Sequence, residues 1–345
     1  MTRPTTRSPD VILARTRELT TPPLRAATDG LHPSLARVCA YHFGWCDRYG
    51  SPRRGAVPSK MVRAATALLA AEAAGGEHRE PAAVPGAVAV ELLHNFTLLH
   101  DDVLDEDKLR RGRPTAWVVF GSGLAVLAGD ALTAAAARTL ADIGTDAGHR
   151  ALAILLECFA ALCDGEADDL DLSRPTTVED YLRMSAGKTG SLLAASAAIG
   201  ATLASGDDRL VGGLRSACLA AALAWQAAND VEDIWGWGDP AVTGKPAFGD
   251  LRQRKVTLPV LAAARSGTPA GDEIAALLAA TADDPPWDVA HIARLIEKAG
   301  GRAYAEQLAR DQLITAHREL DRVGIPDPAK SELASLFRLI VTRTF

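Results

Sequence analysis

Negative and positive side chains are concentrated in one short segment, NFTLLHDDVLDEDKLRRGRPT, which spans residues 95–115. Five carboxylates lie within seven residues of it and three arginines follow: Asp101, Asp102, Asp105, Glu106, Asp107, Arg110, Arg111 and Arg113. Mutual neutralisation on a solvated helix end would account for such a charged run. The alternative is a ligand that interacts with both the acidic and the basic side chains, such as a polyanion bound together with its metal ions.

The spacing of the acids favours a metal. On a helix, Asp101 and Asp105 are four residues apart and share a face, so their carboxylates can converge on one ion or ion pair. Like charges at this spacing repel, and Asp102 adds a third. A hard divalent cation offsets that repulsion, and an all-oxygen ligand set that retains several waters suits Mg²⁺.

A second segment repeats this arrangement. In WQAANDVEDIWGWGDP, Asn229 and Asp233 are four residues apart, with Asp230 and Glu232 between them. The basic side chains that follow are Lys245, Arg252, Arg254 and Lys255. Because an acidic cluster precedes a basic one twice, we favour function over neutralisation. Two such helices facing each other across a bundle would hold metals that bridge a diphosphate, and the apolar interior would take a hydrocarbon tail.

Composition indicates the elements that must position these residues. Of 345 residues, 48% are hydrophobic and only 5% aromatic; alanine is abundant and β-branched runs are short, which predicts an all-α protein. We expect a mobile amino-terminal arm over residues 1–20 and one helical domain over residues 21–345. The main expected helices cover residues 85–107, 124–143, 148–164, 177–205, 208–236 and 301–322.

Several classes of function are disfavoured. The net charge is −6 and no basic block is present, which argues against nucleic acid as a partner. Five cysteines without a CxxC pair, and an amino terminus unlike a signal peptide, indicate free thiols in the cytoplasm. The uncharged stretch between Lys188 and Asp207 is rich in Ala, Gly, Ser and Thr, so we expect a buried helix there and no stable membrane insertion.

The motifs resemble those of the trans-isoprenyl diphosphate synthase (polyprenyl synthetase) family, from about residue 35 to the end of the chain. LLHDDVLDEDKLRRGRPT is similar to its first aspartate-rich motif, DDxxD followed by an arginine pair. GDALTAAA, GKTGSLLAAS and GKPAFGDLRQRKVTLP resemble later motifs, and YHFGW resembles actinobacterial members. The resemblance implies an isoprenoid synthase helical bundle around a central cavity. It also implies a cytoplasmic, homodimeric, Mg²⁺-dependent prenyltransferase that condenses isopentenyl diphosphate with an allylic diphosphate.

The resemblance assigns roles to individual residues. Three Mg²⁺ ions would be held by Asp101, Asp105, Asn229, Asp230 and Asp233, with Asp102 in support and Asp169 in the outer shell. The groups expected at the allylic substrate are Arg110, Lys188, Lys245 and Lys255. Isopentenyl diphosphate would lie on Lys60, Arg63, His94 and Arg111. Thr189 and Gln226 would face the reacting carbons.

Product length is expected to depend on what blocks the tunnel. Phe96 lies five residues before Asp101, more than one helical turn below the metal site, and Leu93 lies about one turn deeper. In the family, an aromatic residue at this position implies a short product. We expect geranylgeranyl diphosphate (C20), with farnesyl diphosphate (C15) next.

The sequence departs from the family pattern at several positions. Asn229 stands where the second motif normally opens with aspartate, and Glu166 stands where glutamine is common. Pro58, Ser59 and Ala64 also differ from the usual residues around the first substrate lysine. Two alternatives therefore stay open: a class I terpene cyclase on the same fold, and a non-catalytic partner subunit. The isopentenyl diphosphate residues argue against the first, and the intact first motif argues against the second.

Overall fold

The computed structural model describes residues 6–53, 59–76, 79–170, 177–204, 207–236, 248–279 and 288–342. Regular structure in these ranges is almost entirely helical, which confirms the all-α prediction. The exception within them is a short antiparallel hairpin of β1 (Leu109–Arg110) and β2 (Arg113–Pro114).

The chain divides into two compact units. The first comprises Met1–Phe159, Leu192–Arg215 and Val323–Leu336, and the second comprises Ala160–Ser191, Ser216–Arg322 and Phe337–Phe345. The division falls inside α7 (Asp146–Leu170), α10 (Asp208–Trp235) and α17 (Ala329–Thr342), and it also separates a single end residue from α9 (Ser191–Ala204) and from α16 (Gly301–Val323). The expectation of a single domain over residues 21–345 stays a prediction.

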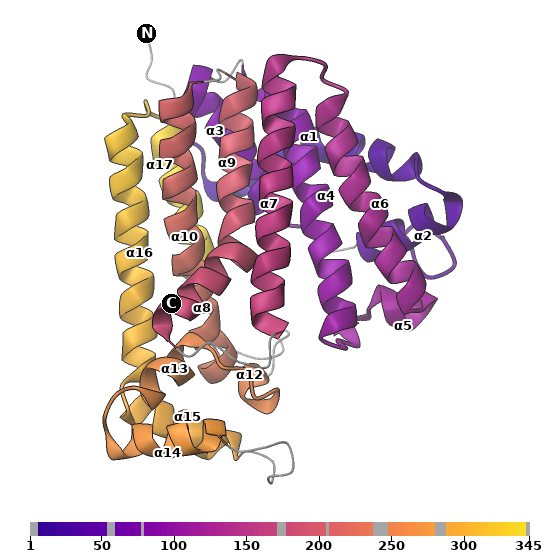
Figure 1. Ribbon diagram of the computed structural model, residues 1–345. Coiled ribbons are helices and arrows are strands. Elements are labelled where there is room, and N and C mark those ends of the chain that lie inside the picture. Colours follow the sequence, from indigo (N-terminus) through magenta and orange to yellow (C-terminus); the bar gives the residue numbers. More distant parts are fainter. Residues whose placement is uncertain are drawn as a thin grey trace. The chain divides into compact units, whose positions relative to one another are not determined.

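Helix α4 is the central helix of the first unit. The other helices of this unit are α1 (Pro9–Asp29), α2 (Pro33–His42), α3 (Val62–Gly75), α5 (Ala116–Phe120), α6 (Ser122–Ala141) and α9 (Ser191–Ala204). α4 (Glu80–Leu104) packs along α6 and α3 (Figure 1). Small residues let helices approach closely here: a Cβ on Gly200 would lie 1.9 Å from the carbonyl oxygen of Ala67, so only glycine fits where α9 crosses α3.

The second unit contains several short helices and the long helix α16. They are α8 (Val178–Ser185), the π-helical turn η2 (Ala186–Gly190), α12 (Gly249–Arg252), α13 (Leu258–Ala264), α14 (Pro269–Ala279), α15 (Val289–Lys298) and α16 (Gly301–Val323). Ile234 at the end of α10 packs with apolar side chains of α12 to α15, including Leu251, Val260 and Ile296, in one buried cluster. This cluster anchors the carboxyl end of α10, where the second acidic segment lies.

The long uncharged stretch after Lys188 forms α9 as a buried helix, as expected. Leu192, Leu193 and Ile199 are almost completely buried in it. In the described part of the chain, the helices α4, α6 and α10, and not α9, are long and apolar enough to cross a membrane by length and composition alone. In the most hydropathic window of α4, 67% of the residues are buried within the protein, so much of its apolar surface already has protein partners.

The amino-terminal arm expected over residues 1–20 is helical from Pro9 onward, so that expectation is wrong for residues 9–20. Ile12, Thr16, Thr20 and Leu24 recur every four residues and are buried along one face of α1. The stripe was missed because half of it is threonine and because Pro22 and Pro23 interrupt the usual helical pattern.

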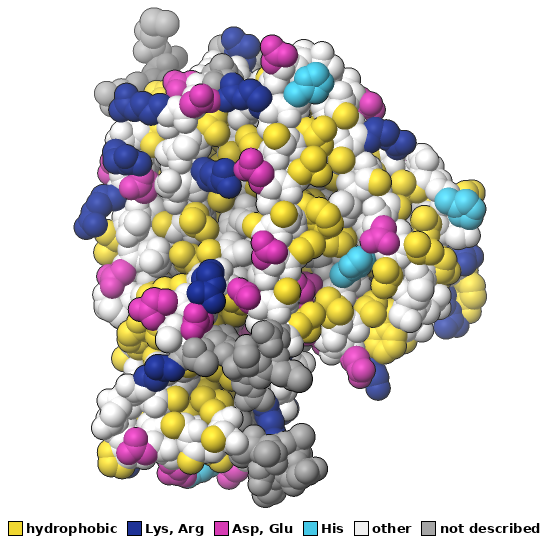
Figure 2. Space-filling view, viewed as in Figure 1, with side chains coloured by type: hydrophobic (Ala, Val, Ile, Leu, Met, Phe, Trp, Pro, Cys, Tyr) yellow, Lys and Arg dark blue, Asp and Glu magenta, His cyan; other side chains and the backbone are white. Residues whose placement is uncertain are grey.

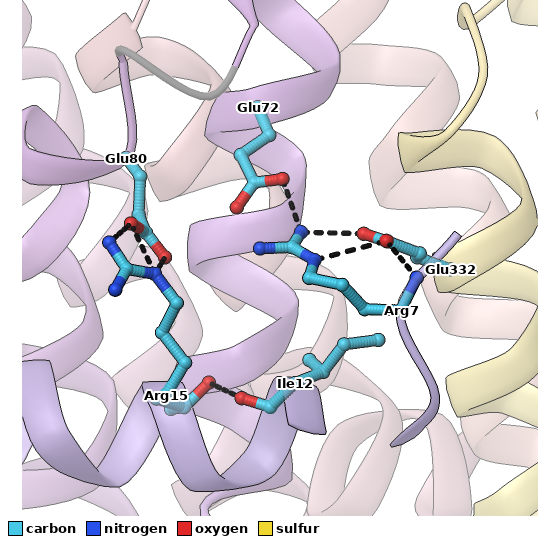
Figure 3. A network of polar contacts seen from close by, with 7 residues as sticks. Arg7, Ile12, Arg15, Glu72, Glu80 and Glu332 are labelled. Carbon is cyan, nitrogen blue, oxygen red and sulfur yellow. Dashed lines mark hydrogen bonds and ion pairs between the residues drawn. The ribbon is translucent and has the colours of Figure 1, made fainter. Parts of the chain in front are cut away.

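A buried charge network ties the residues before α1 to the first unit. The guanidinium of Arg7 donates to Glu72 on α3 and to Glu332 on α17, with both N–O distances 2.5 Å. The Arg7 backbone N–H also donates to Glu332 at 2.7 Å. Figure 3 shows Arg7 between the two carboxylates, with the Arg15–Glu80 pair nearby. The glutamate side chains are 3% and 0% exposed, so Arg7 is their main source of compensation for lost hydration.

Replacing Arg7 with alanine is expected to lower the free energy of unfolding by about 3 kcal/mol at pH 7, because two buried carboxylates lose their cation. Burial already raises the pKa of Glu72, opposed by Arg7. Without Arg7 the folded pKa rises further above the unfolded value, so the variant regains stability as the pH falls and the carboxylate binds a proton. The measurement is urea unfolding at pH 7 and pH 5.

The matched control is Arg322→Ala, which removes an exposed arginine paired with Glu319. It should change the free energy of unfolding by less than about 1 kcal/mol at either pH. Equal losses for the two variants would contradict a structural role of the Arg7 network.

Candidate active site

The first acidic segment lies at the carboxyl end of α4. The backbone N–H of Asp105, the residue that caps the helix, donates to the carbonyl of Asp101 at 2.8 Å, so the two half-buried side chains are one turn apart. Asp102 is buried; its Oδ1 accepts from Nε of Arg110 at 2.6 Å, and burial raises the pKa of this carboxyl against the pull of Arg110. The carboxyl end of a helix carries partial negative charge, which repels carboxylates placed there. A bound cation offsets this repulsion.

The acids of α4 fit Mg²⁺ when a phosphate ligand completes the coordination. Within the described ranges, no three His, Cys, Asp or Glu side chains are grouped to hold a metal alone. Two carboxylates with waters and substrate phosphates are the usual Mg²⁺ arrangement. The buried Oδ2 of Asp102 has no hydrogen-bond partner, so one carboxylate oxygen beside the pair is an unused acceptor.

A two-residue turn presents the arginines that follow the acids. Arg111 and Gly112 connect β1 to β2 with φ of 53° and 70°, as a type I′ turn requires. Non-glycine residues rarely adopt such φ values. All five that do so in the described part lie in the motif segments or directly beside a predicted ligand: Met61, Glu106, Arg111, Phe248 and Arg254. Strain of this kind is common where structure serves binding.

Basic side chains meet between α3 and α4. Nη1 of Arg63 lies 3.1 Å from Nε2 of His94. Burial, reinforced by Arg63 and Arg111, lowers the pKa of His94 well below its ordinary value, so the ring is neutral. Because a guanidinium only donates, Nε2 accepts and Nδ1 carries the proton. That N–H is buried without a hydrogen-bond partner, which suits an anionic ligand.

The lysine of the GKTG segment lies on a π-helical turn in the second unit. Nζ of Lys188 is 2.6 Å from Oδ2 of Asp169 and 2.8 Å from Oε2 of Glu166, both on α7. Burial alone would lower the pKa of Lys188, but the two carboxylates raise it above the ordinary value. Gly165 permits this close approach of α7 to the π-turn, because a Cβ at that position would lie 2.4 Å from the backbone nitrogen of Lys188. π-turns are rare and frequent at functional sites.

A hydrogen-bond chain runs from the same turn into the interior of the second unit. The Thr189 hydroxyl donates to Oε1 of Gln226 at 3.0 Å, and Nε2 of Gln226 donates to Oδ1 of Asp230 at 3.0 Å. Oδ2 of Asp230 accepts from the Tyr181 hydroxyl and, at 3.0 Å, from the backbone N–H of Leu258. Asp230 is 3% exposed, whereas the neighbouring Asn229 and Asp233 are half-buried.

The residues expected to set product length are buried on α4. Leu93 is fully buried, and Phe96 is 8% exposed. The Phe96 ring meets that of Phe159 on α7 edge-on, with centroids 5.4 Å apart, and that of His100 at 4.6 Å. Two aromatic rings from different helices therefore meet about two turns below the acids.

The family of the chain follows from a comparison with known proteins. The model of the family described as Polyprenyl synthetase matches residues 54–296. The chain belongs to the polyprenyl synthetase family. This confirms the resemblance drawn from the aspartate-rich motifs, and with it the isoprenoid synthase fold.

Relatives cover nearly the whole chain. Over 343 residues, it is 41% identical to a (2E,6E)-farnesyl diphosphate synthase of Mycobacterium tuberculosis, covering 96% of this chain and 92% of the relative. It is also 41% identical to a geranylgeranyl diphosphate synthase of that organism, covering 96% and 93%. The crystal structure of a polyprenyl synthetase from Streptomyces coelicolor A3(2) superposes with a TM-score of 0.88 at 42% identity, covering 96% of this chain and 99% of that one.

The predicted site residues of this polyprenyl synthetase fall into two groups. In the first unit, Asp102 meets Arg110 and Arg63 meets His94, while Lys60 is exposed. In the second unit the structure connects Lys188 with Asp169, and Thr189 with Gln226 and Asp230; Lys255 is half-buried. Lys245 lies outside the described residues. The predicted metal-binding role of Asp101, Asp105, Asn229, Asp230 and Asp233 stays a prediction.

Three residues around the basic cluster, Glu91, His42 and Asn95, were not predicted from the sequence. Glu91 is 1% exposed and accepts from the Ala64 N–H at 3.3 Å, and Arg63 opposes the rise that burial causes in its pKa. Burial, reinforced by neighbouring arginines, lowers the pKa of His42 to about 3, and a hydrogen bond with Asn95 opposes this. Glu91 stands one turn before His94, and His42 lies in YHFGW, so their positions were the available signal.

A separate pocket of about 570 Å³ in the first unit is lined by the ends of α3, α7 and α9, including Arg79, Asp146, Arg150 and Thr202. It contains none of the predicted site residues, and Arg150 there is paired with Asp208. We therefore place the chemistry at the motif residues.

Proposed function

We propose that this polyprenyl synthetase is a Mg²⁺-dependent prenyltransferase that condenses isopentenyl diphosphate with an allylic diphosphate, head to tail and trans, to give a short-chain prenyl diphosphate. The expected product is geranylgeranyl diphosphate (C20), and farnesyl diphosphate (C15) is the alternative. The observation that carries the proposal is the pairing, within one unit, of acids at the end of α4 with the Arg63–His94 cluster between α3 and α4.

The acidic side chains hold the metal and the allylic diphosphate. In the first unit, Asp101 and Asp105 would hold Mg²⁺; in the second unit, Asn229 and Asp233 would do so, with Asp169 in the outer shell. Mg²⁺ held by these residues would supply the positive charge that neutralises a leaving diphosphate. Arg110, Lys188, Lys245 and Lys255 donate to the phosphate oxygens.

The basic cluster of the first unit binds isopentenyl diphosphate. Arg63 and Arg111 supply permanent positive charge, and the Nδ1–H of neutral His94 is a directed donor. Lys60 is exposed three residues before Arg63, on the segment that leads into α3. The double bond of this substrate then attacks the allylic cation, and proton loss to the released diphosphate completes the elongation.

Glu166 is expected to weaken binding of the allylic diphosphate, because it competes with the diphosphate for Lys188. Glu166→Gln removes one of two carboxylates from the lysine and should lower the KM for the allylic substrate by up to about fivefold, as for a partly exposed ion pair worth about 1 kcal/mol. Steady-state kinetics at saturating isopentenyl diphosphate measure this.

The control is Glu179→Gln, the same charge change on an exposed residue of α8. Its KM should stay at the wild-type value. A KM that is unchanged or higher in Glu166→Gln would show that Glu166 does not compete for Lys188.

A homodimer fits the exposed apolar surface, and we place it in the cytoplasm as the family resemblance implies. Figure 2 shows apolar side chains gathered on the face where α4, α6 and α7 lie in Figure 1. The exposed apolar residues of α6 and α7 include Leu127 at 53%, Leu156 at 50% and Val126 at 37%. Contiguous exposed apolar surface of this kind marks interaction sites. Burial of this face against a second copy would remove it from water.

Release of inorganic diphosphate tests the proposed function. Release should require Mg²⁺, an allylic diphosphate and isopentenyl diphosphate together, and EDTA should abolish it. Release from an allylic diphosphate alone would favour a cyclase, and no release under any combination would favour a non-catalytic subunit.

A further inference from the structure

The hydrogen-bond chain of the second unit has a defined direction. The carboxylate of Asp230 on α10 is buried. The Tyr181 hydroxyl on α8 and the backbone N–H of Leu258 at the start of α13 both donate to it. Gln226 stands one turn before Asp230 on α10 and joins that carboxylate to Thr189 on the π-turn. We propose that Asp230 and Tyr181 are positioning residues that fix the Gln226 amide and, through it, orient the Thr189 hydroxyl. The proposal rests on the proposed prenyl transfer.

The chemistry of each group sets the direction of the chain. An ionised carboxylate only accepts hydrogen bonds, so Gln226 must turn its NH₂ group toward Asp230. Its carbonyl oxygen then faces Thr189, and the hydroxyl can only donate to it. The lone pairs of the Thr189 oxygen can then interact with a ligand on the other side of the π-turn.

An oriented lone pair is useful for the proposed reaction, in which an allylic cation forms. Dipoles that are fixed before the reaction stabilise developing charge without a reorganisation cost. A hydroxyl free to rotate would turn its proton toward solvent or phosphate for part of the time. The buried negative charge of Asp230, transmitted through the amide, keeps the hydroxyl in the useful orientation.

The same geometry separates Asp230 from the metal-binding role expected from the sequence. Gln226 and Asp230 are four residues apart and share one face of α10, whereas Asn229 and Asp233 share another. Three donors occupy the two oxygens of Asp230, and the residue is 3% exposed. The structure therefore assigns the interior position to Asp230 and leaves Asn229 and Asp233 as the metal-facing pair.

The test compares Asp230→Asn with Asp233→Asn, the same chemical change three residues away on the same helix. Asp230→Asn should lower kcat about 10²-fold, as expected when a preorganised group is lost, and should leave both KM values and the half-saturating Mg²⁺ concentration within about twofold of wild type. Asp233→Asn should raise the half-saturating Mg²⁺ concentration. Tyr181→Phe removes one of the two donors to Oδ2 and should lower kcat by a smaller factor of about 10, again without a change in KM.

A second readout does not depend on turnover. Inorganic diphosphate with Mg²⁺ should raise the Tm of Asp230→Asn by as much as that of wild type, and should raise the Tm of Asp233→Asn less. Tyr181→Phe keeps Asp230 and its charge, so it tests the chain if Asp230→Asn does not fold.

Three results would overturn the proposal or its basis. A raised Mg²⁺ requirement in Asp230→Asn, equal to that of Asp233→Asn, would make Asp230 a metal ligand. An unchanged kcat in both Asp230→Asn and Tyr181→Phe would show that the chain positions nothing of consequence. If the wild-type protein itself makes no elongated product, the proposed function fails and this inference fails with it; an active wild type with unaffected variants contradicts the inference alone.

Discussion

Replacing Asp101 and Asp105 together with asparagine is expected to lower kcat by about 10³-fold or more. Metal-assisted neutralisation of a leaving diphosphate contributes several kcal/mol to the rate, and each 1.36 kcal/mol is about tenfold. The two acids lie one turn apart at the carboxyl end of α4. Steady-state kinetics over a range of Mg²⁺ concentrations measure the loss.

The same variant should be at least as stable as wild type. Two negative charges at a helix carboxyl end oppose the helix dipole, so their removal should raise the free energy of unfolding by roughly 0.5 kcal/mol in the absence of Mg²⁺. Glu106→Gln, which neutralises an exposed acid of the same segment, is the matched control and should keep nearly full activity. Equal activity losses in both variants, or loss of fold in the double variant, would contradict the metal-binding role and favour a solvated charged helix end.

Replacing Phe96 with alanine is expected to lengthen the product by one C5 unit. Phe96 lies five residues before Asp101, and Leu93 lies three residues deeper on α4. Three residues of helix rise about 4.5 Å, close to the length of one isoprene unit of roughly 5 Å. Leu93 then stops the chain, so the shift should be one unit rather than open-ended growth. Mass analysis of dephosphorylated products measures it.

Phe159 gives a second test of the same barrier, because its ring meets that of Phe96 edge-on. Phe159→Ala should also shift the product toward greater length. Phe120→Ala, which removes an aromatic ring packed on Tyr41, is the control and should not change the product. An unchanged product distribution in Phe96→Ala would show that this pair of rings does not end the tunnel.

The acids and the long helices were the most predictable parts of this protein. Carboxylates four residues apart on an amphipathic helix depend only on local geometry, and α10 was expected at residues 208–236 and is found at Asp208–Trp235. The expected helix over residues 177–205 is three elements, because α8 ends at Ser185 and a π-turn precedes α9. That turn follows from close contact between Gly187 and Gly165 on α7, which local sequence does not encode.

The parts of the site that escaped prediction depend on contacts distant in the sequence. Tyr181 and Asp230 are separated by 49 positions, and Glu91 and Ala64 by 27. The family resemblance assigned Asp230 to the metal, whereas the burial of its carboxylate depends on contacts from α8 and α13. Charge patterns therefore predict the kind of ligand, and tertiary packing distinguishes the buried acid Asp230 from its half-buried neighbours.

The most direct test of the account is the mass of the products made by the purified protein with Mg²⁺, isopentenyl diphosphate and, in separate reactions, dimethylallyl, geranyl or farnesyl diphosphate. The account predicts elongated prenyl diphosphates, mainly C20, that form only when isopentenyl diphosphate is present. A cyclic hydrocarbon or alcohol made from one prenyl diphosphate without isopentenyl diphosphate would contradict it.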